Sequence, residues 1–259
     1  MIFLPQAPSS VVMIRPHHFS PNAQTAADNS FQSKAVTSNT QLSQLAYAQV
    51  TLAAEKLSQL GVCVHLFEDN SKETPDSVFP NNWFSTHSGG QIAIYPMYAK
   101  NRRKERRHDI IEMLKAQYRV QDVIDYSGLE YDNLFLEGTG AMVLDHTERV
   151  AYAVASKRTE SHVLERFCSH FNYEPMIFEA FDETGAPVYH TNVLMCIGSD
   201  YVLAGFDMIA DEARRNEIIA RFKSAGKTTI SLTEKQISGF CGNALELSSK
   251  NGRLLALSQ

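Results

Sequence analysis

Four short segments of the sequence each contain a residue type that could take part in covalent catalysis. The residues are Cys241 in FCGNALEL (240–247), His190 in YHTNVLMCIG (189–198), Glu137 in FLEGTGAMVLD (135–145) and Asn82 in FPNNWFST (79–86). A cysteine reacts as its thiolate, and a neighbouring histidine can stabilise the thiolate and move protons to and from a leaving group. A glutamate can hold the histidine or orient a substrate nitrogen, and asparagine amides both donate and accept hydrogen bonds. Together these residue types predict a cysteine-dependent active site, provided that the fold brings them together.

Each segment also has an ordinary structural interpretation. Free cysteines are among the most buried residues and are usually inert. The LEGTG sequence could be a glycine-rich turn, His190 a hydrogen-bonded core residue, and the PNN sequence a turn held by an asparagine side chain. The catalytic interpretation therefore depends on whether the four segments occupy equivalent places in the fold.

A repeated order of strands and helices runs through the chain. With Phe79, Leu136, Tyr189 and Phe240 as reference points, the repeats are 57, 53 and 51 residues apart. Each complete repeat has two strand-like runs, a helix and a third strand, and the helices are predicted at about 103–117, 160–171 and 211–225. An earlier unit has strands at 9–16 and 62–68 around a helix at 41–61. The pattern predicts an α/β fold of five ββαβ-type units that close radially, the fifth being shared between the two ends of the chain.

Radial closure would direct equivalent positions of the units towards one axis. Those positions hold the polar residues Asn81 and Asn82, Glu137, His190 and Asn192, and Cys241. The repeat therefore predicts one central pocket in which a cysteine faces a histidine and a glutamate, which is the arrangement of a nucleophile and its base.

The same residues resemble the guanidine-modifying enzymes, namely arginine deiminase, dimethylarginine dimethylaminohydrolase and the amidinotransferases. The resemblance rests on FPNN where those enzymes have F-x-x-D, and on YPMYAKNRR (95–103) where arginine deiminase has P-M-Y-x-x-x-R-R. It continues with LEG in place of E-G-G-D, HTN in place of H-x-D, and a late cysteine next to a glycine. It covers nearly the whole chain and implies a five-bladed, pseudo-symmetric α/β propeller, the pentein fold, as a single domain over residues 1–259.

The resemblance also implies roles for individual residues. Cys241 would be the nucleophile, with His190 and Glu137 as its acid/base partners. Arg102 would hold the substrate α-carboxylate, a role that suits a guanidinium group. Arg15, at the end of the first predicted strand, is a further substrate-binding candidate from its position alone.

Three departures from the family pattern bear on the substrate. Asn82 and Asn192 stand where two aspartates grip the cationic guanidinium of arginine, and Gly140 stands where the acidic residue of E-G-G-D would be. Losing three negative charges disfavours a cation, whereas amides that donate and accept hydrogen bonds suit a neutral ureido group. The chain also resembles one branch of this superfamily, the citrulline-utilisation hydrolases. The implied reaction is thiolate attack on the ureido carbon of citrulline or a related amino acid, giving ornithine, ammonia and carbon dioxide.

Other functions remain open at the level of the sequence. A deiminase or dimethylaminohydrolase acting on a guanidino substrate would need Asn82 and Asn192 to accept a cation with Glu137 as the counter-charge. An amidinotransferase would use the same cysteine but keep water from the covalent intermediate. A non-catalytic propeller that binds a macromolecular partner is the alternative from another class, and the presence of Glu137, His190 and Cys241 disfavours it.

The composition narrows the class of protein. The net charge is −5 and 44% of the 259 residues are hydrophobic, which is ordinary for a globular protein and disfavours a nucleic-acid partner. The four cysteines lack CxxC or metal-ligand spacing, so we expect neither a metal nor another cofactor. No apolar run reaches the length of a membrane span, and we expect a cytoplasmic protein with a small-molecule partner. Self-association is left open.

Several remaining features carry weaker expectations. Cys63 and Cys196 lie in apolar strand runs and are expected in the core, whereas His87 is expected to be solvated. The polar connection over residues 17–40 is long enough to suggest a lid over the pocket. The chain ends after the second strand of a unit, from which we expect that a C-terminal helix and strand are missing.

Overall fold

The computed structural model describes residues 6–26, 29, 31 and 38–258, and within them the chain forms five small sheets. Three sheets share one order, in which an antiparallel hairpin is followed by a helix and a third strand parallel to the second. These are β3 (Phe84–His87), β4 (Gln91–Ile94), α2 (His108–Gln117) and β5 (Asp122–Asp125); β6 (Met142–Asp145), β7 (Val150–Val154), α4 (Ser161–Phe171) and β8 (Glu174–Phe178); and β9 (Met195–Ile197), β10 (Tyr201–Ala204), α6 (Glu212–Ser224) and β11 (Thr228–Ser231). The repeated ββαβ unit predicted from the sequence is therefore present three times.

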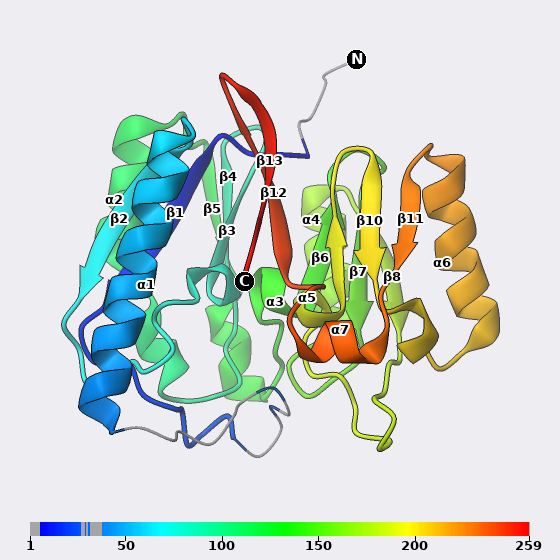
Figure 1. Ribbon diagram of the computed structural model, residues 1–259, viewed down its shortest axis with the longest axis horizontal. Coiled ribbons are helices and arrows are strands. Elements are labelled where there is room, and N and C mark those ends of the chain that lie inside the picture. The colour runs from blue at the N-terminus through cyan, green and yellow to red at the C-terminus, as the bar shows by residue number, and fades with distance from the viewer. Residues whose placement is uncertain (1–5, 27–28, 30, 32–37, 259) are drawn as a thin grey trace.

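The other two sheets have two strands each. β1 (Ser10–Pro16) pairs in parallel with β2 (Cys63–Asp69) across α1 (Asn39–Gln59), which corresponds to the second half of a ββαβ unit. β12 (Ala244–Ser249) and β13 (Gly252–Leu257) form an antiparallel hairpin, which corresponds to the first half. In Figure 1 this red hairpin stands between the sheets of the two halves of the chain, with α1 and α2 on one outer side and α6 on the other.

The helices cover the sheets through apolar faces that the sequence places at three- and four-residue spacing. The buried residues are Ile110, Ile111 and Leu114 of α2, Val163, Leu164, Phe167, Cys168 and Phe171 of α4, and Ile218 and Phe222 of α6. The β6–β8 sheet and the β9–β11 sheet share one core, in which the ring of Tyr152 lies 4.7 Å from that of Phe222. None of the helices in the described ranges is both long and apolar enough to cross a membrane.

Short helical turns connect the units. They are η1 (Pro80–Asn82), η2 (Arg102–Glu105), η3 (Ser127–Asp132), α3 (Gly138–Ala141), α5 (Thr191–Leu194), η4 (Phe206–Met208) and α7 (Glu234–Ser238). The helix expected from about residue 103 begins only at His108, because Arg102 and Glu105 lie in the separate turn η2 and bury their side chains against each other.

Two minor expectations were wrong. Cys63 is exposed, because it is the first residue of an edge strand. His87 packs its ring against Phe171, with ring centroids 4.2 Å apart, instead of facing solvent. Its neighbour in the hairpin, Ser85, supplies a hydroxyl 2.6 Å from His87 Nε2.

Candidate active site

The predicted polar residues lie in the turns that directly precede the first strands of four sheets. Glu137 is the residue before α3 and stands five positions before β6, and His190 is the residue before α5 and stands five positions before β9. Asn82 ends η1, before β3, and Cys241 follows α7, before β12. The four residues are therefore presented at the same end of their sheets, where Figure 1 shows α3, α5 and α7.

Glycines allow these turns to pack directly on one another. A Cβ added at Gly138, whose φ is +49°, would lie 2.3 Å from the carbonyl oxygen of Asn81 in η1. A Cβ added at Gly242 would lie 2.6 Å from the carbonyl oxygen of Val193 in α5. Since real Cβ atoms do not approach so closely, glycine is required at both positions. The Cys241 turn thus lies against the helix that follows His190.

Glu137 and His190 form a buried pair at the centre of this row. His190 Nε2 lies 2.9 Å from Glu137 Oε2, and the other carboxylate oxygen accepts a hydrogen bond from the backbone N–H of Tyr98 at 3.0 Å. Glu137 is also adjacent to Asn82, whose Nδ2 donates to the Glu137 carbonyl oxygen at 3.3 Å. All three side chains are buried. The structure thus places three of the sequence-derived candidates in direct contact.

Two arginines place positive charge next to the carboxylate of Glu137. Arg158 Nη1 lies 3.4 Å and Arg102 Nη1 lies 3.8 Å from Glu137 Oε2. Burial alone would raise the pKa of Glu137, but the His190 hydrogen bond and the charges of His190 and the two arginines outweigh it and lower the pKa to about 2. Burial lowers the pKa of His190, against the opposing effect of Glu137. Glu137 is therefore ionised at neutral pH.

Arg102 is held in place by other residues of the protein. Its Nε and Nη2 donate to the carboxylate of Glu105 at 2.9 Å each, and Nη2 also donates to the carbonyl oxygen of Phe79 at 3.3 Å. Asp76 adds a carboxylate oxygen 3.7 Å from Arg102 Nε. Only 3% of Arg102 is exposed. The contacts that we observe for its guanidinium are to carboxylates and to backbone carbonyl groups.

Arg158 was not recognised from the sequence. It lies in the turn after β7, its backbone carbonyl oxygen accepts from the Glu137 N–H at 3.1 Å, and its guanidinium lies 5.0 Å from the centre of the Tyr189 ring. The sequence signal for it is a single charged pair, Lys157 and Arg158, that follows an apolar run, and a solvated turn explains that pattern equally well. Because Arg158 is 2% exposed, only the tertiary structure distinguishes it from a surface arginine.

Cys241 is half-buried and follows a strained residue. Phe240 has a φ of +63°, which a bulky side chain rarely adopts, and strained backbone of this kind is often found at functional sites. The Cys241 N–H donates to the carbonyl oxygen of Gln236 at 3.0 Å and fixes the turn. Phe31 contacts both Tyr189 and Phe240, with centroid distances of 6.1 and 5.4 Å, so the residues directly before His190 and Cys241 meet over one ring.

Asn192 lies in α5, two residues after His190, and is half-buried. Within the described part of the chain its amide makes no hydrogen bond. Phe31 is a described residue of the 17–40 connection that reaches this region, whereas residues 27, 28, 30 and 32–37 of the expected lid lie outside the described residues.

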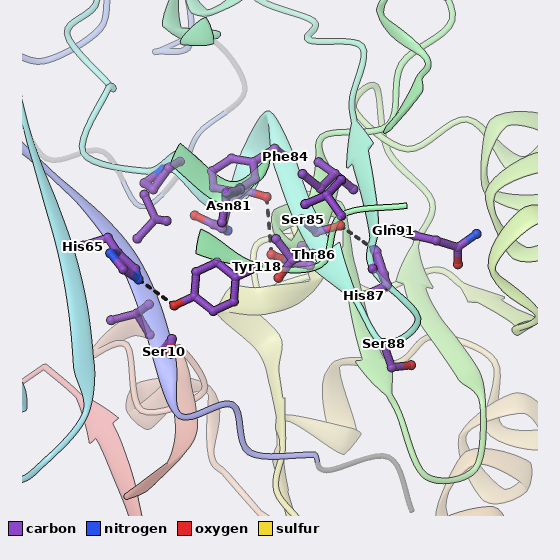
Figure 2. A pocket seen from close by; sticks show the side chains of 18 of the residues that line it. Ser10, His65, Asn81, Phe84, Ser85, Thr86, His87, Ser88, Gln91 and Tyr118 are labelled. Carbon is purple, nitrogen blue, oxygen red and sulfur yellow. Dashed lines mark hydrogen bonds between the residues drawn. The ribbon is translucent and has the colours of Figure 1, made fainter. Parts of the chain in front are cut away.

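Two candidates lie away from the Glu137–His190 pair. Asn81 lines a cavity of about 660 Å³ between β1, β3 and β12 whose lining does not include Asn82, Glu137, His190 or Cys241. Figure 2 shows Asn81 in this cavity near Phe84, with His65 and Tyr118 opposite. Arg15 makes an ion pair with Glu68 of the neighbouring strand, donates to Thr51 at 3.1 Å and lies over the Tyr47 ring. The structure thus gives both residues other surroundings.

Comparison with protein families places most of the chain within a family match. The family described as N,N dimethylarginine dimethylhydrolase, eukaryotic, matches residues 15–259. No curated protein matches the sequence at a significant level.

Solved structures share the fold at low identity. ArgZ, an arginine dihydrolase from the ornithine–ammonia cycle in cyanobacteria, has a TM-score of 0.68 and 18% identity in its apo form, over 91% of this chain and 33% of that chain. A mutant of AgrE in complex with L-arginine has a TM-score of 0.70 and 20% identity, over 91% and 32%. A dimethylarginine dimethylaminohydrolase adduct with S-methyl-L-thiocitrulline has a TM-score of 0.58 and 14% identity, over 90% and 80%. This chain spans about a third of ArgZ and AgrE, and the likeness is one of an α/β fold with repeated small mixed sheets.

Proposed function

The chain belongs to the N,N dimethylarginine dimethylhydrolase family, and from that premise we propose that it is a cysteine-dependent hydrolase acting on the ureido group of citrulline or a related amino acid. Cys241 is the proposed nucleophile, with His190 as its acid and base and Glu137 as the group that orients His190. Asn82 and Asn192 would bind the ureido group. The proposed setting is a five-bladed propeller, which is supported by the first strands of three units lying side by side, with β9 against both β6 and β12.

The proposed reaction has two stages. His190 accepts the thiol proton, and the Cys241 sulfur attacks the ureido carbon. The C–N bond to the terminal amine breaks as His190 returns the proton to the departing ammonia, which leaves a thiocarbamate on the sulfur. Water, deprotonated by His190, then breaks the C–S bond. The resulting carbamate separates into the amine of ornithine and carbon dioxide, so one citrulline and one water give ornithine, ammonia and carbon dioxide.

The charges around Glu137 are the observation that supports a neutral substrate. Glu137 supplies negative charge, but Arg158 lies 3.4 Å from its carboxylate, and Arg102, which also pairs with Glu105 and Asp76, lies 3.8 Å from it. A guanidinium cation approaching this carboxylate would meet two buried arginines, whereas an uncharged ureido group would not be repelled. Asn192, whose amide is not engaged by the described part of the chain, can donate to the ureido oxygen or accept from its N–H groups.

We propose Arg102 as the ligand of the substrate α-carboxylate, as the family resemblance implies. Arg102 was the candidate from the sequence, but its two-point pairing with Glu105 makes it a support for Glu137 as much as a ligand.

Hydrolysis of a guanidino substrate is the second candidate, favoured by the description of the matching family, which names a dimethylated arginine. It shares the thiol chemistry and differs in the charge of the group attacked. The two candidates are separated by the substrate alone.

A substrate panel tests the proposal. Ammonia and carbon dioxide release would be measured with citrulline, arginine and N,N-dimethylarginine, for the unmodified protein and for Cys241→Ser and Cys63→Ser. We expect release from citrulline that Cys241→Ser abolishes and that Cys63→Ser, which alters an exposed thiol elsewhere, leaves unchanged. Release from arginine or its methylated form with citrulline untouched would favour the guanidino candidate and refute the ureido assignment.

A further inference from the structure

Gly140 is the third residue of α3. Two side chains of the candidate site lie next to the position that a Cβ atom would occupy at this residue. A Cβ added there would lie 2.1 Å from Asn82 Nδ2 and 3.0 Å from both Nδ1 and Cε1 of His190. Its φ lies outside the left-handed region, unlike that of Gly138, so the backbone itself would accept any residue. Glycine is therefore required at position 140 by space and not by conformation.

Neither neighbour can move aside without losing a contact. The Asn82 amide is buried and donates to the Glu137 carbonyl oxygen at 3.3 Å. The His190 ring is buried and lies 2.9 Å from the Glu137 carboxylate. A side chain at position 140 would have to displace the Asn82 amide, and it would also press on the imidazole ring at Nδ1 and at Cε1, the carbon bonded to the Nε2 atom that faces Glu137.

We propose that Gly140 is a positioning and specificity-determining residue, which leaves the space that the Asn82 amide occupies between α3 and His190. Asn82 and Gly140 then act as one unit. An acidic residue at position 140, as in the arginine-directed enzymes that the sequence resembles, could not coexist with the Asn82 amide where it now lies. The choice of amide over carboxylate is thus coupled between two positions that are 58 residues apart in the sequence. The specificity part of this inference rests on the proposed function, whereas the positioning part does not.

The coupling extends to substitutions of Asn82 itself. Its Nδ2 atom donates to the carbonyl oxygen of Glu137, so Asn82→Asp would place an acceptor against an acceptor at about the same distance. Restoring a carboxylate at position 82 alone is therefore expected to disturb Glu137 rather than to create a guanidinium site.

A double-mutant cycle tests the coupling. Gly140→Ala is expected to lower kcat/KM for the substrate that the panel identifies by about 100-fold, because a displacement of about 1 Å at a reacting group costs on this order. In an Asn82→Ala background, where the nearest clashing atom is gone, the same change is expected to cost less than about 10-fold. Gly128→Ala is the matched control, because a Cβ at Gly128 meets nothing within 4 Å. Equal losses in both backgrounds, or full activity of Gly140→Ala, would refute the proposal.

A second measurement does not depend on turnover. In NMR spectra of protein with ¹⁵N-labelled histidine rings, the His190 signals would be identified by their loss in His190→Asn. We expect Gly140→Ala to shift the His190 ring signals, Gly128→Ala to leave them in place, and Gly140→Ala in the Asn82→Ala background to shift them less. Unchanged His190 signals in Gly140→Ala would overturn the positioning role even if the protein turned over none of the substrates. Shifted signals in a protein without turnover would instead refute only the proposed function.

Discussion

His190 and His87 are both largely buried against aromatic rings, but they differ in the partner that each ring nitrogen meets. His190 lies 2.9 Å from the carboxylate of Glu137 and 4.6 Å, ring to ring, from Tyr189. His87 meets the hydroxyl of Ser85 at 2.6 Å, and its Nδ1 is buried with no hydrogen-bond partner among the described residues. Burial lowers the pKa of His87 to about 3, with further lowering by His146 and Arg149.

The difference shows what makes a buried histidine suitable for proton transfer. Both rings lose hydration, which disfavours the protonated form. The Glu137 carboxylate opposes that effect at His190 and would stabilise an imidazolium formed during the reaction. In the described part of the chain no carboxylate contacts His87, so it can only pack and exchange one hydrogen bond.

Removing the carboxylate should give the largest effect. We expect Glu137→Gln to lower kcat by about 10³-fold, since a positioned acid/base group contributes roughly 10²–10⁴-fold and His190 would lose its orienting charge. Unfolding in urea, followed by circular dichroism, would show a lower free energy of unfolding, because Arg102 and Arg158 would keep their buried charges without this partner.

The matched control for that variant is Ser85→Ala, which removes the side-chain partner of His87. Its kcat is expected to stay within about two-fold of the unmodified protein, since His87 does not contact the proposed site. A large loss of kcat in Ser85→Ala, or none in Glu137→Gln, would contradict the distinction between the two histidines.

Acid should destabilise the protein through its buried histidines. Burial lowers the pKa of His87 to about 3 and that of His146 to about 4, both below the usual 6.5. The unfolded chain therefore binds protons first, so this part of the stability is fully present above pH 6.5 and is lost as the pH falls towards 4 and 3. We expect a loss of about 2 kcal/mol for each histidine between pH 7 and pH 5. Urea midpoints measured across that interval would reveal it, and a flat profile would argue against these buried neutral rings.

The smallest expected effect isolates His87. His87→Phe keeps a ring against Phe171 but removes the titrating group, so the loss of stability between pH 7 and pH 5 should shrink by about 2 kcal/mol. Activity at pH 7 should be retained. An acid profile identical to that of the unmodified protein would mean that His87 does not titrate in the way that its surroundings indicate.

The sequence predicted the pairing of Glu137 with His190 because both residues recur at one offset before a strand, and a repeated unit places equal offsets at equal places. It placed Asn82 in the same pocket for the same reason, but as a substrate ligand and not as a donor to the backbone of Glu137. It did not predict Arg158 or the pairing of Arg102 with Glu105, because a charged residue in a turn has the same local pattern whether it is buried or solvated. His87 was misjudged for that reason as well, since the rings of Phe167 and Phe171 that cover it come from a helix about 80 residues away.

By itself, the sequence determined the ββαβ repeat, the positions of the polar residues within it and the family resemblance, because strand and helix periodicity and turn residues act over short distances. Only the tertiary structure decided which charges surround Glu137, which arginines are already paired, and why position 140 holds a glycine. Those properties depend on distances between side chains and on the space left between turns, which residues far apart in the chain create only when they pack together.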